Sequence, residues 1–248
     1  MSSPTVYLVS GANRGLGLGL VTALVQRPDT IVFAGARDPP NATDLNALAA
    51  AHAGKLHVVK LVSADTESNT AAAAQIAKVA DHIDVVIANA AVGDVFADAL
   101  TASKEEMTRH FDINVNGPLL LFQATHDLLK ASKAPKFVAL SSPVGSITTG
   151  SQFPGRTYTY GASKAALHWV VRKLHKDFED LVIFPISPGA VETEMLRLAV
   201  EKEPWMSTMP SKSPADSAAG ILKQIDAATR ETASGQFLDV GGEMVWPW

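Results

Sequence analysis

Two side chains four positions apart, Tyr160 and Lys164, have the types needed to deliver a proton to a reacting oxygen. Reduction of a carbonyl group needs a hydride at carbon and a proton at the developing alkoxide, and a positioned acid stabilises that charge as it forms. A free phenol has a pKa of about 10, so it needs a nearby cation to lower this pKa before it donates readily at neutrality. Residues four apart share a helix face, which predicts that the Lys164 ammonium lies beside the Tyr160 phenol.

The same spacing also occurs in solvated surface pairs, so the pair alone does not establish a site. Tyr158 is the alternative acid in this segment, but the residue four positions beyond it is Ala162, which carries no cation. We therefore expect Tyr160, rather than Tyr158, to be the acid.

A glycine-rich segment near the amino terminus has the pattern of a phosphate-binding turn. It lies between a β-branched and apolar run at 5–10 and apolar residues at helical spacing from 16 to 25, and it reads Ser10-Gly11-Ala12-Asn13-Arg14-Gly15-Leu16-Gly17. Glycines at a strand-to-helix junction let the backbone turn tightly and approach a pyrophosphate at the helix amino terminus. Glycines also serve ordinary turns, but this placement within a strand–helix–strand unit favours dinucleotide binding.

The elements that must position these residues alternate between strands and helices along the chain. Short apolar runs predict strands at 5–10, 31–36, 56–62, 84–88, 137–141, 181–187 and 236–240, with helix-like segments between most of them. The runs at 85–88 and 137–140 are apolar throughout, which is typical of strands buried on both faces of a parallel sheet. The pattern predicts an α/β fold with a doubly wound (Rossmann) parallel sheet of about seven strands and helices on both faces.

The length of 248 residues is compatible with one domain built around one such sheet. We expect a single domain over 1–248, with a dinucleotide-binding part at about 1–140 and a catalytic and substrate-binding part at about 141–248. Two stretches after strands, 142–159 and 195–214, have no clean period. They are either substrate-contacting loops or plain surface connections.

Composition and charge exclude several classes of protein. The net charge of -4 gives no basic face for nucleic acid or an anionic membrane, and the lack of cysteine excludes disulfides and thiolate sites. No apolar stretch reaches the roughly 20 residues of a spanning helix, and residues 1–10 lack the features of a signal peptide. We expect a cytoplasmic protein with a small-molecule partner. The seven histidines lack metal-ligand spacing, so we expect them to be surface or polar helix residues, with no metal site.

The spacing Gly-x-x-x-Gly-x-Gly and the motifs that follow it resemble those of the short-chain dehydrogenase/reductase family. These motifs keep the family's order and span nearly the whole chain: Asn89-Ala90-Ala91, Asn114-Val115-Asn116-Gly117, Ser141-Ser142, Tyr160-Gly161-Ala162-Ser163-Lys164 and Pro188-Gly189. The ensemble is more specific than any member, because residue types, order and strand-end placement must all coincide. The resemblance implies a nicotinamide dinucleotide cofactor and oxidoreductase activity.

The resemblance also implies a catalytic role for each residue of the set Ser142, Tyr160, Lys164 and Asn114. Ser142 would orient the substrate carbonyl, with Ser141 as the alternative, and Lys164 would also reach the nicotinamide ribose. The backbone carbonyl of Asn114 would hold a water that extends a proton relay from Lys164 to solvent. The alternative for Asn114 is a simple polar residue of a helix.

The end of the second predicted strand, at 34–38, indicates NADPH rather than NADH. An NAD enzyme usually places a carboxylate there for the ribose hydroxyls, whereas a 2′-phosphate is repelled by a carboxylate and attracted by arginine. No carboxylate precedes Arg37, and Arg37 with Arg14 would form a two-arginine clamp on the phosphate. If the side chain of Asp38 faced the ribose instead, this preference would weaken or reverse.

The adenine end departs from the family, because Val62 stands where relatives commonly have an aspartate, and Ala91 replaces a usual glycine. Asp65 substitutes for that aspartate, or backbone groups hold the adenine. The resemblance implies that Val191 and Thr193 contact the nicotinamide carboxamide. The full set of implied cofactor contacts is Gly11, Asn13, Arg14, Gly15, Leu16, Gly17, Arg37, Asp65, Asn89, Ala90, Tyr160, Lys164, Pro188, Gly189, Val191 and Thr193.

The opening segment at 6–15 most resembles the norsolorinic acid ketoreductase and Sniffer carbonyl reductase branches of the family. That resemblance implies NADPH-dependent reduction of a ketone or aldehyde, with a bulky or aromatic ketone as substrate. The alternatives are a non-catalytic dinucleotide-binding sensor or scaffold, and a member adapted to a non-redox cyclisation. Family members often pair through their long central helices, which implies a homodimer or homotetramer. We expect the aromatic segment at 243–248 to pack on the core, rather than on a substrate cleft or subunit interface.

Overall fold

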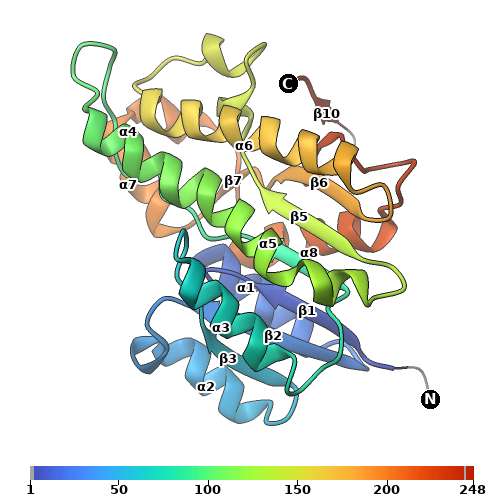
Figure 1. Ribbon diagram of the computed structural model, residues 1–248. Helices are drawn as coiled ribbons and strands as arrows, with labels where there is room; N and C mark the ends of the chain where they lie inside the picture. Colours follow the sequence, from blue (N-terminus) through green and yellow to red (C-terminus); the bar gives the residue numbers. More distant parts are fainter. Residues whose placement is uncertain (1–2, 243) are drawn as a thin grey trace.

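A central sheet of eight strands runs through the part of the chain that the computed structural model describes, residues 3–242 and 244–248 (Figure 1). The strands are β1 (Thr5–Val9), β2 (Thr30–Ala36), β3 (Leu56–Lys60), β4 (Val85–Ala88), β5 (Lys136–Leu140), β6 (Val182–Ser187), β9 (Phe237–Asp239) and β10 (Val245–Trp246). They lie in the order β10-β9-β6-β5-β4-β1-β2-β3, and β10 alone is antiparallel to its neighbour. The predicted doubly wound parallel sheet and its seven strands are confirmed, with β10 added as a short edge strand.

The central strands are apolar because helices cover both faces of the sheet. Every residue of β4 is buried, and β5 is buried from Phe137 to Leu140. The two strands pair in parallel with Val86 opposite Phe137. If polar and apolar residues alternated along these strands, the polar side chains would be buried under a helix. Continuous apolar runs are therefore the correct sign of strands covered on both faces.

The helices cover the two faces in two groups. The group on one face consists of α1 (Gly15–Val25), α2 (Thr43–Ala51) and α8 (Pro214–Ala227). The group on the other face consists of α3 (Thr66–Ile76), α5 (Gly117–Lys130) and α6 (Tyr158–Asp177). On this second face, α4 (Lys104–Phe111) continues through the π-helical turn η2 (Asp112–Asn116) into α5, and it packs on α6 (Figure 1). Within the residues described, no helix has the length and apolar character needed to cross a membrane.

The two stretches without a clean period contain short regular elements. Residues 142–159 include two 3-10 turns, η3 (Pro143–Gly145) and η4 (Gly150–Gln152). Another short 3-10 turn, η1 (Pro39–Asn41), lies elsewhere in the chain, after β2. The expectation of a loop at 195–214 is wrong, because the segment holds most of α7 (Glu194–Lys202), then η5 (Pro204–Thr208) and β8 (Ser211–Lys212). β8 pairs with β7 (Ala190–Val191). α7 spans only nine residues, which is too short a window to show its period clearly.

The aromatic closing segment packs on the core, as predicted. Trp246 of β10 lies opposite Phe237 of β9. The ring centroid of Trp248 lies 6.2 Å from that of Phe237 and 5.7 Å from that of His168. The predictions that involve Met1, Ser2 and Glu243 lie outside the described residues.

Candidate functional site

The carboxyl ends of β1, β4, β5 and β6 meet at one edge of the sheet and carry the residues identified from the sequence. The strand order reverses between β1 and β4, since β2 and β3 lie beyond β1 while β5 and β6 lie beyond β4. Such a switch point leaves a crevice for a ligand outside the strand ends. The glycine loop follows β1, Asn89 follows β4, Ser142 follows β5 and Pro188 follows β6.

The glycine loop at 10–17 leads from β1 directly into the amino end of α1. A Cβ on Gly17 would lie 2.2 Å from the carbonyl oxygen of Gly11, so the loop admits no side chain there. α1 begins at Gly15, after Arg14, and no side chain caps its first backbone N–H groups. Uncapped N–H groups at the positive end of the helix dipole favour an anion. The loop therefore fits the pyrophosphate of a dinucleotide.

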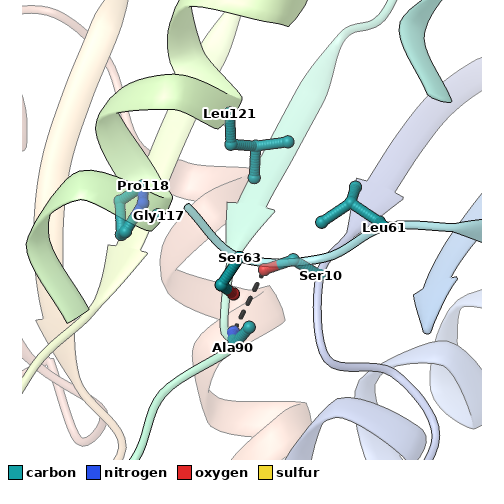
Figure 2. A pocket seen from close by; sticks show the side chains of 7 residues that line it. All are labelled: Ser10, Leu61, Ser63, Ala90, Gly117, Pro118 and Leu121. Atoms are coloured by element: carbon teal, nitrogen blue, oxygen red, sulfur yellow. Dashed lines mark hydrogen bonds between the residues drawn. The ribbon is translucent and has the colours of Figure 1, made fainter. Parts of the chain in front are cut away.

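Hydrogen bonds between Ser10 and Asn89 tie the ends of β1 and β4 together. The Ser10 hydroxyl accepts hydrogen bonds of 3.0 Å from the backbone N–H groups of Asn89 and Ala90, the second of which Figure 2 shows. The Asn89 side-chain amide donates to the carbonyls of Ser10 and Gly11, at 2.9 and 3.1 Å. Asn89 thus shapes the glycine loop from the neighbouring strand.

A small cavity of about 10 Å³ lies between this junction and the start of α5 (Figure 2). This volume has room for about one water molecule. The cavity reflects packing between the strand ends and α5, and its lining consists of Ser10, Leu61, Ser63, Ala90, Gly117, Pro118 and Leu121.

The residues after β3, at the predicted adenine end, are held by hydrogen bonds of their own. The Asp65 carboxylate accepts a hydrogen bond of 2.9 Å from the backbone N–H of Ser68 and caps α3. The N–H of Val62 donates to the Ser68 hydroxyl at 3.0 Å, and its carbonyl accepts from the Asn69 amide at 2.9 Å. The structure gives Asp65 a helix-capping role, and its contact with adenine stays a prediction.

Tyr160, Lys164 and His168 form a row, spaced by four, on the face of α6 that meets the end of β5. The Lys164 Nζ donates a hydrogen bond of 2.9 Å to the carbonyl of Leu140, the last residue of β5. It also lies 5.5 Å from the centroid of the Tyr160 ring, and Lys164 is only 2% exposed. The expected proximity of Tyr160 and Lys164 is present, while their catalytic roles stay predictions.

Burial controls the protonation of both groups. Burial raises the pKa of Tyr160 to about 12, although a side-chain hydrogen bond with Ser142 acts in the opposite direction. It lowers the pKa of Lys164 to about 7. We expected the Lys164 ammonium to lower the pKa of Tyr160. This expectation is wrong, because desolvation of the phenol dominates and the pKa is raised. The phenol keeps its proton at neutral pH, as a proton donor must.

The structure separates the two serines that follow β5. Ser142 lies close enough to Tyr160 to lower the pKa of the phenol somewhat, and its Oγ accepts a hydrogen bond from the backbone N–H of Val144 at 3.3 Å. Ser141 is 3% exposed, and its Oγ lies 2.6 Å from the Nε2 of His168. Tyr158, the alternative acid, is 52% exposed at the first position of α6. Of the residues weighed for these roles, Ser142 and Tyr160 are thus the pair that the fold brings together.

Asn114 lies in the π-helical turn η2, and its side chain joins three segments. Its amide nitrogen donates to the Val92 carbonyl at 2.8 Å and to the Ser163 hydroxyl at 2.9 Å, and its oxygen accepts from the Val92 N–H at 2.9 Å. The Ser163 hydroxyl in turn donates to the Tyr160 carbonyl at 2.7 Å. π-helical turns often occur at functional sites. The water-holding role of the Asn114 carbonyl stays a prediction.

The Tyr160 ring packs against Gly93, which the sequence did not single out. A Cβ on Gly93 would lie 2.9 and 3.0 Å from the Cδ2 and Cε2 of Tyr160, and 3.4 Å from the Sδ of Met195. Met195, near the start of α7, therefore brings an apolar side chain close to the phenol. No motif marks Gly93, and Met195 lay in a segment without a readable period.

The segment after β6 lies directly against the glycine loop. It turns at Pro188-Gly189, and Val191 then pairs within the β7–β8 ladder. Thr193 caps α7 by accepting a hydrogen bond of 3.4 Å from the backbone N–H of Leu196. Its methyl group lies 3.1 Å from the position that a Cβ on Gly15 would take. The fold thus places this segment beside the loop, as the expected cofactor contacts require.

The two arginines of the predicted phosphate clamp, Arg14 and Arg37, are both exposed near the ends of β1 and β2. The Arg14 guanidinium forms an ion pair with the carboxylate of Glu194, the first residue of α7. The Asp38 carboxylate accepts a hydrogen bond of 2.7 Å from the Asn41 side chain. A carboxylate from α7 therefore faces one arginine of the clamp, while Asp38 is engaged with its own turn.

The expectation that all seven histidines are surface or polar helix residues fails for His57, which lies on strand β3 with a buried Nε2. His110 and His168 lie on helices, as expected, but both are buried. His168 was identifiable in principle, because it follows Lys164 by four residues. His110 lies with Asp94 and Glu106, whose ligand-type atoms fall within 4.8 Å of one another. The Arg109 guanidinium joins the two carboxylates at 2.5 and 2.8 Å, so this cluster is an ion-pair network. The expected absence of a metal stays a prediction.

Comparison with known proteins agrees with the motifs. The family model described as short chain dehydrogenase matches residues 5–204. The norsolorinic acid ketoreductase of Aspergillus parasiticus is 40% identical over 252 residues, which cover 98% of this chain and 91% of the relative.

Two solved structures cover 100% of this chain and are themselves covered over 100% of their length. The NADPH-bound carbonyl reductase from chicken fatty liver has a TM-score of 0.88 at 28% identity. The carbonyl reductase Sniffer of D. melanogaster has a TM-score of 0.86, and at 24% identity it shows the same fold. The resemblance to the norsolorinic acid ketoreductase branch is confirmed, and the likeness to Sniffer is confirmed at the level of the fold.

Proposed function

The chain belongs to the short-chain dehydrogenase family, and from this premise we propose that it reduces a ketone or aldehyde to an alcohol with NADPH. One observation carries the proposal. The Tyr160 phenol lies near Ser142, whose hydroxyl influences its pKa, and beside the buried Lys164 ammonium, at the sheet edge where the uncapped amino end of α1 favours a pyrophosphate. A proton donor, a carbonyl-orienting hydroxyl and a dinucleotide loop therefore converge on one crevice.

The proposed chemistry divides between cofactor and protein. The bound nicotinamide supplies a hydride to the carbonyl carbon. Ser142 donates a hydrogen bond that orients the carbonyl oxygen, and Tyr160 transfers its proton to that oxygen as negative charge develops. The Lys164 ammonium, in its desolvated position, stabilises the phenolate left on Tyr160.

The proton lost by Tyr160 must be replaced before the next turnover. Lys164 is the nearest cation in this arrangement, with its Nζ 5.5 Å from the phenol ring centroid. We propose that the proton returns through Lys164 and a water held at the backbone of Asn114. The bonds of the Asn114 side chain to Val92 and Ser163 would hold that backbone in place.

The proposed cofactor contacts follow the same crevice. The uncapped N–H groups of α1 would bind the pyrophosphate, and the segment at 188–193 would contact the nicotinamide side. Lys164 would also contact the nicotinamide ribose. The remaining contacts proposed from the sequence are Gly11, Asn13, Gly15, Leu16, Gly17, Asp65, Asn89 and Ala90.

NADPH is proposed over NADH because of the charges at the end of β2. Arg37 is exposed there, and Arg14 is exposed in the glycine loop, where a 2′-phosphate would compete with Glu194 for its guanidinium. The Asp38 carboxylate keeps its charge, but its hydrogen bond with Asn41 holds it within its own turn. The chicken fatty liver carbonyl reductase, 28% identical, was solved with NADPH bound, which supports the same choice.

A bulky, aromatic ketone is the proposed substrate class. The relative at 40% identity is a norsolorinic acid ketoreductase. The wall beside Tyr160 suits such a substrate, since Gly93 leaves it without a side chain and Met195 adds a flexible apolar one.

Turnover of a panel of ketones, followed as NADPH oxidation, tests the proposal. Tyr160→Phe should lower kcat by at least about a hundredfold, because general acid catalysis contributes about that much. Tyr158→Phe is the matched control, since it removes the same hydroxyl from the exposed tyrosine two residues away and should leave turnover unchanged. Equal activity of Tyr160→Phe and the wild-type protein would remove Tyr160 as the acid.

The same panel separates the alternatives. Dinucleotide binding without turnover of any carbonyl would indicate the non-catalytic sensor or scaffold, and product formation without NADPH oxidation would indicate a non-redox cyclisation. Cofactor choice is tested by Arg37→Ala. It should weaken NADPH binding by about tenfold, as expected for one charge-assisted contact, and leave NADH binding unchanged. Intact NADPH affinity would disprove the clamp.

A further inference from the structure

His168 is a buried polar side chain that the proposed reduction does not use. It is 4% exposed, and its Nε2 lies 2.6 Å from the Oγ of Ser141, which is equally buried. The rings of Phe237 and Trp248 pack on the imidazole, with centroids 4.4 and 5.7 Å away. Because both side chains are buried, separating the two atoms would leave each of them without a hydrogen-bond partner.

This contact and a second hydrogen bond fasten α6 to the end of β5. The Leu140 carbonyl accepts from Lys164, and the Ser141 hydroxyl, one residue further on, is bonded to His168. The next residue, Ser142, lies close enough to Tyr160 to influence the pKa of the phenol. Lys164, Ser142 and Tyr160 have proposed roles in the reaction, whereas the bond between Ser141 and His168 has no such role.

The imidazole is suited to a fixed structural bond. Burial, with a smaller contribution from the charge of Lys164, lowers the pKa of His168 to about 4. The ring is therefore neutral at physiological pH, with one nitrogen that donates and one that accepts. In either tautomer Nε2 has a complementary role for the Ser141 hydroxyl, which can both donate and accept.

We propose that His168 is a positioning residue: by binding Ser141 it fixes the main chain at 141–142 against α6 and so sets the Ser142 hydroxyl relative to the Tyr160 phenol. The catalytic part of this inference rests on the proposed carbonyl reduction. The structural part concerns only the contact between Ser142 and Tyr160. Because Ser141 and Ser142 are adjacent, a shift of one by a few tenths of an ångström moves the other by a similar amount.

The structural part can be measured without any reaction. The chain has three tyrosines, Tyr7, Tyr158 and Tyr160, so a sample with 13C at tyrosine Cζ gives three assignable signals. His168→Met, which removes the hydrogen bond, should shift the Tyr160 signal and leave the Tyr7 signal unchanged. His168→Gln has nearly the same size and shape as the Met variant but keeps an amide nitrogen at the end, and it should restore the Tyr160 signal.

The catalytic part is measured by steady-state kinetics with the same two variants. His168→Met should lower kcat by about tenfold to a hundredfold, as for other small displacements of a catalytic group. The Kd for NADPH should stay the same, since His168 lies behind the strand end rather than in the cofactor crevice. His168→Gln should recover most of kcat. A merely structural role would lower thermal stability in both variants without this difference in kcat.

Ser141→Ala provides the same test from the other partner and keeps the His168 ring packed on Phe237. It should shift the Tyr160 signal as His168→Met does, and the double variant should add nothing further, because both substitutions remove one bond. An unchanged Tyr160 signal in His168→Met and in Ser141→Ala would overturn the proposal. If the protein reduced no carbonyl at all, the proposed function would fall, while the NMR result would still decide the contact.

Discussion

The Nζ of Lys164 donates its hydrogen bond to the carbonyl of Leu140 rather than to the phenol of Tyr160. The ammonium is therefore held at the end of β5 by a neutral acceptor, and within the described residues no carboxylate offsets the effect of burial on its pKa. Burial without a counter-charge is what lowers the pKa of Lys164 to about 7.

This burial predicts a pH-dependent stability. Below pH 7 both the folded and the unfolded chain hold the Lys164 proton, and the folded protein carries the full cost of a buried ammonium. From pH 7 up to the ordinary lysine pKa of 10.5, the unfolded chain binds a proton that the folded protein has released, so stability rises with pH. The contribution of this one proton approaches about 1.4 kcal/mol per pH unit.

Urea unfolding at pH 7, 8 and 9 without dinucleotide checks this prediction. The comparison is with Lys164→Met, which should be the more stable protein at pH 7 and should lack this part of the slope. Lys136, whose pKa is also lowered by burial, contributes in the same direction and is present in both proteins, so it cancels in the difference. Parallel pH curves for the two proteins would contradict the low pKa of Lys164.

Gly93→Ala should displace the phenol of Tyr160. The new Cβ would lie 2.9 Å from the ring, a separation that forces the ring or the main chain to move. We expect kcat to fall by about tenfold to a hundredfold, because a small misplacement of the acid costs that much. Steady-state kinetics with NADPH check this, with Gly241→Ala as a control at an exposed glycine of the β9–β10 turn. Wild-type turnover in Gly93→Ala would mean that the phenol does not need this position.

A buried carboxylate fastens α7 to the segment that precedes Tyr160. Glu203 is 7% exposed and accepts hydrogen bonds from the backbone N–H and the Nε of Arg156, at 3.1 and 2.8 Å, and from the Trp205 indole at 3.2 Å. Burial raises the pKa of Glu203, but these bonds from Arg156 outweigh it and leave the pKa below its ordinary value. The other end of α7 carries Met195, beside Tyr160.

Glu203→Gln should therefore raise the KM for a bulky ketone by several-fold while the Kd for NADPH stays the same. The substitution keeps the shape but weakens the charge-assisted bonds, so α7 holds its place less firmly. Kinetics and NADPH titration measure the two constants separately. Glu201→Gln, on the same helix and paired only with Lys202 in the region described, is the matched control. A KM that does not change, with only a lower Tm, would limit Glu203 to a structural role.

The parallel strands were predictable because helices on both faces make each strand a continuous apolar run. The same logic explains what was missed. β7, β8 and β10 are two residues long and carry no readable period. α7 is only nine residues long, so its apolar residues form too short a repeat to identify a helix between irregular neighbours.

The candidate site was predictable where one motif holds both partners, as with Tyr160 and Lys164 on one helix face. It was not predictable where the partner comes from a distant segment. The role of Asn114 depends on bonds to Val92 and Ser163, 22 and 49 residues away. The direction of the Tyr160 pKa was mistaken because spacing indicates a nearby cation, whereas the depth of burial depends on how several elements pack.

The ion pair between Arg14 and Glu194 leads to a last prediction, about cofactor affinity. Arg14 belongs to the proposed phosphate clamp, so the Glu194 carboxylate competes with the 2′-phosphate of NADPH for one guanidinium. Glu194→Gln should tighten NADPH binding at low salt, by up to about fivefold, since both side chains are exposed and such pairs contribute about 1 kcal/mol at most.

Fluorescence titration of NADPH and NADH at two salt concentrations checks this. NADH lacks the 2′-phosphate, so its affinity should change less, and the gain for NADPH should shrink at high salt because of screening. Glu201→Gln on the same helix removes an equal charge away from Arg14 and should leave the preference for NADPH over NADH unchanged. An equal gain for both dinucleotides would show that Glu194 repels the pyrophosphate they share, and would remove Arg14 from the clamp on the 2′-phosphate.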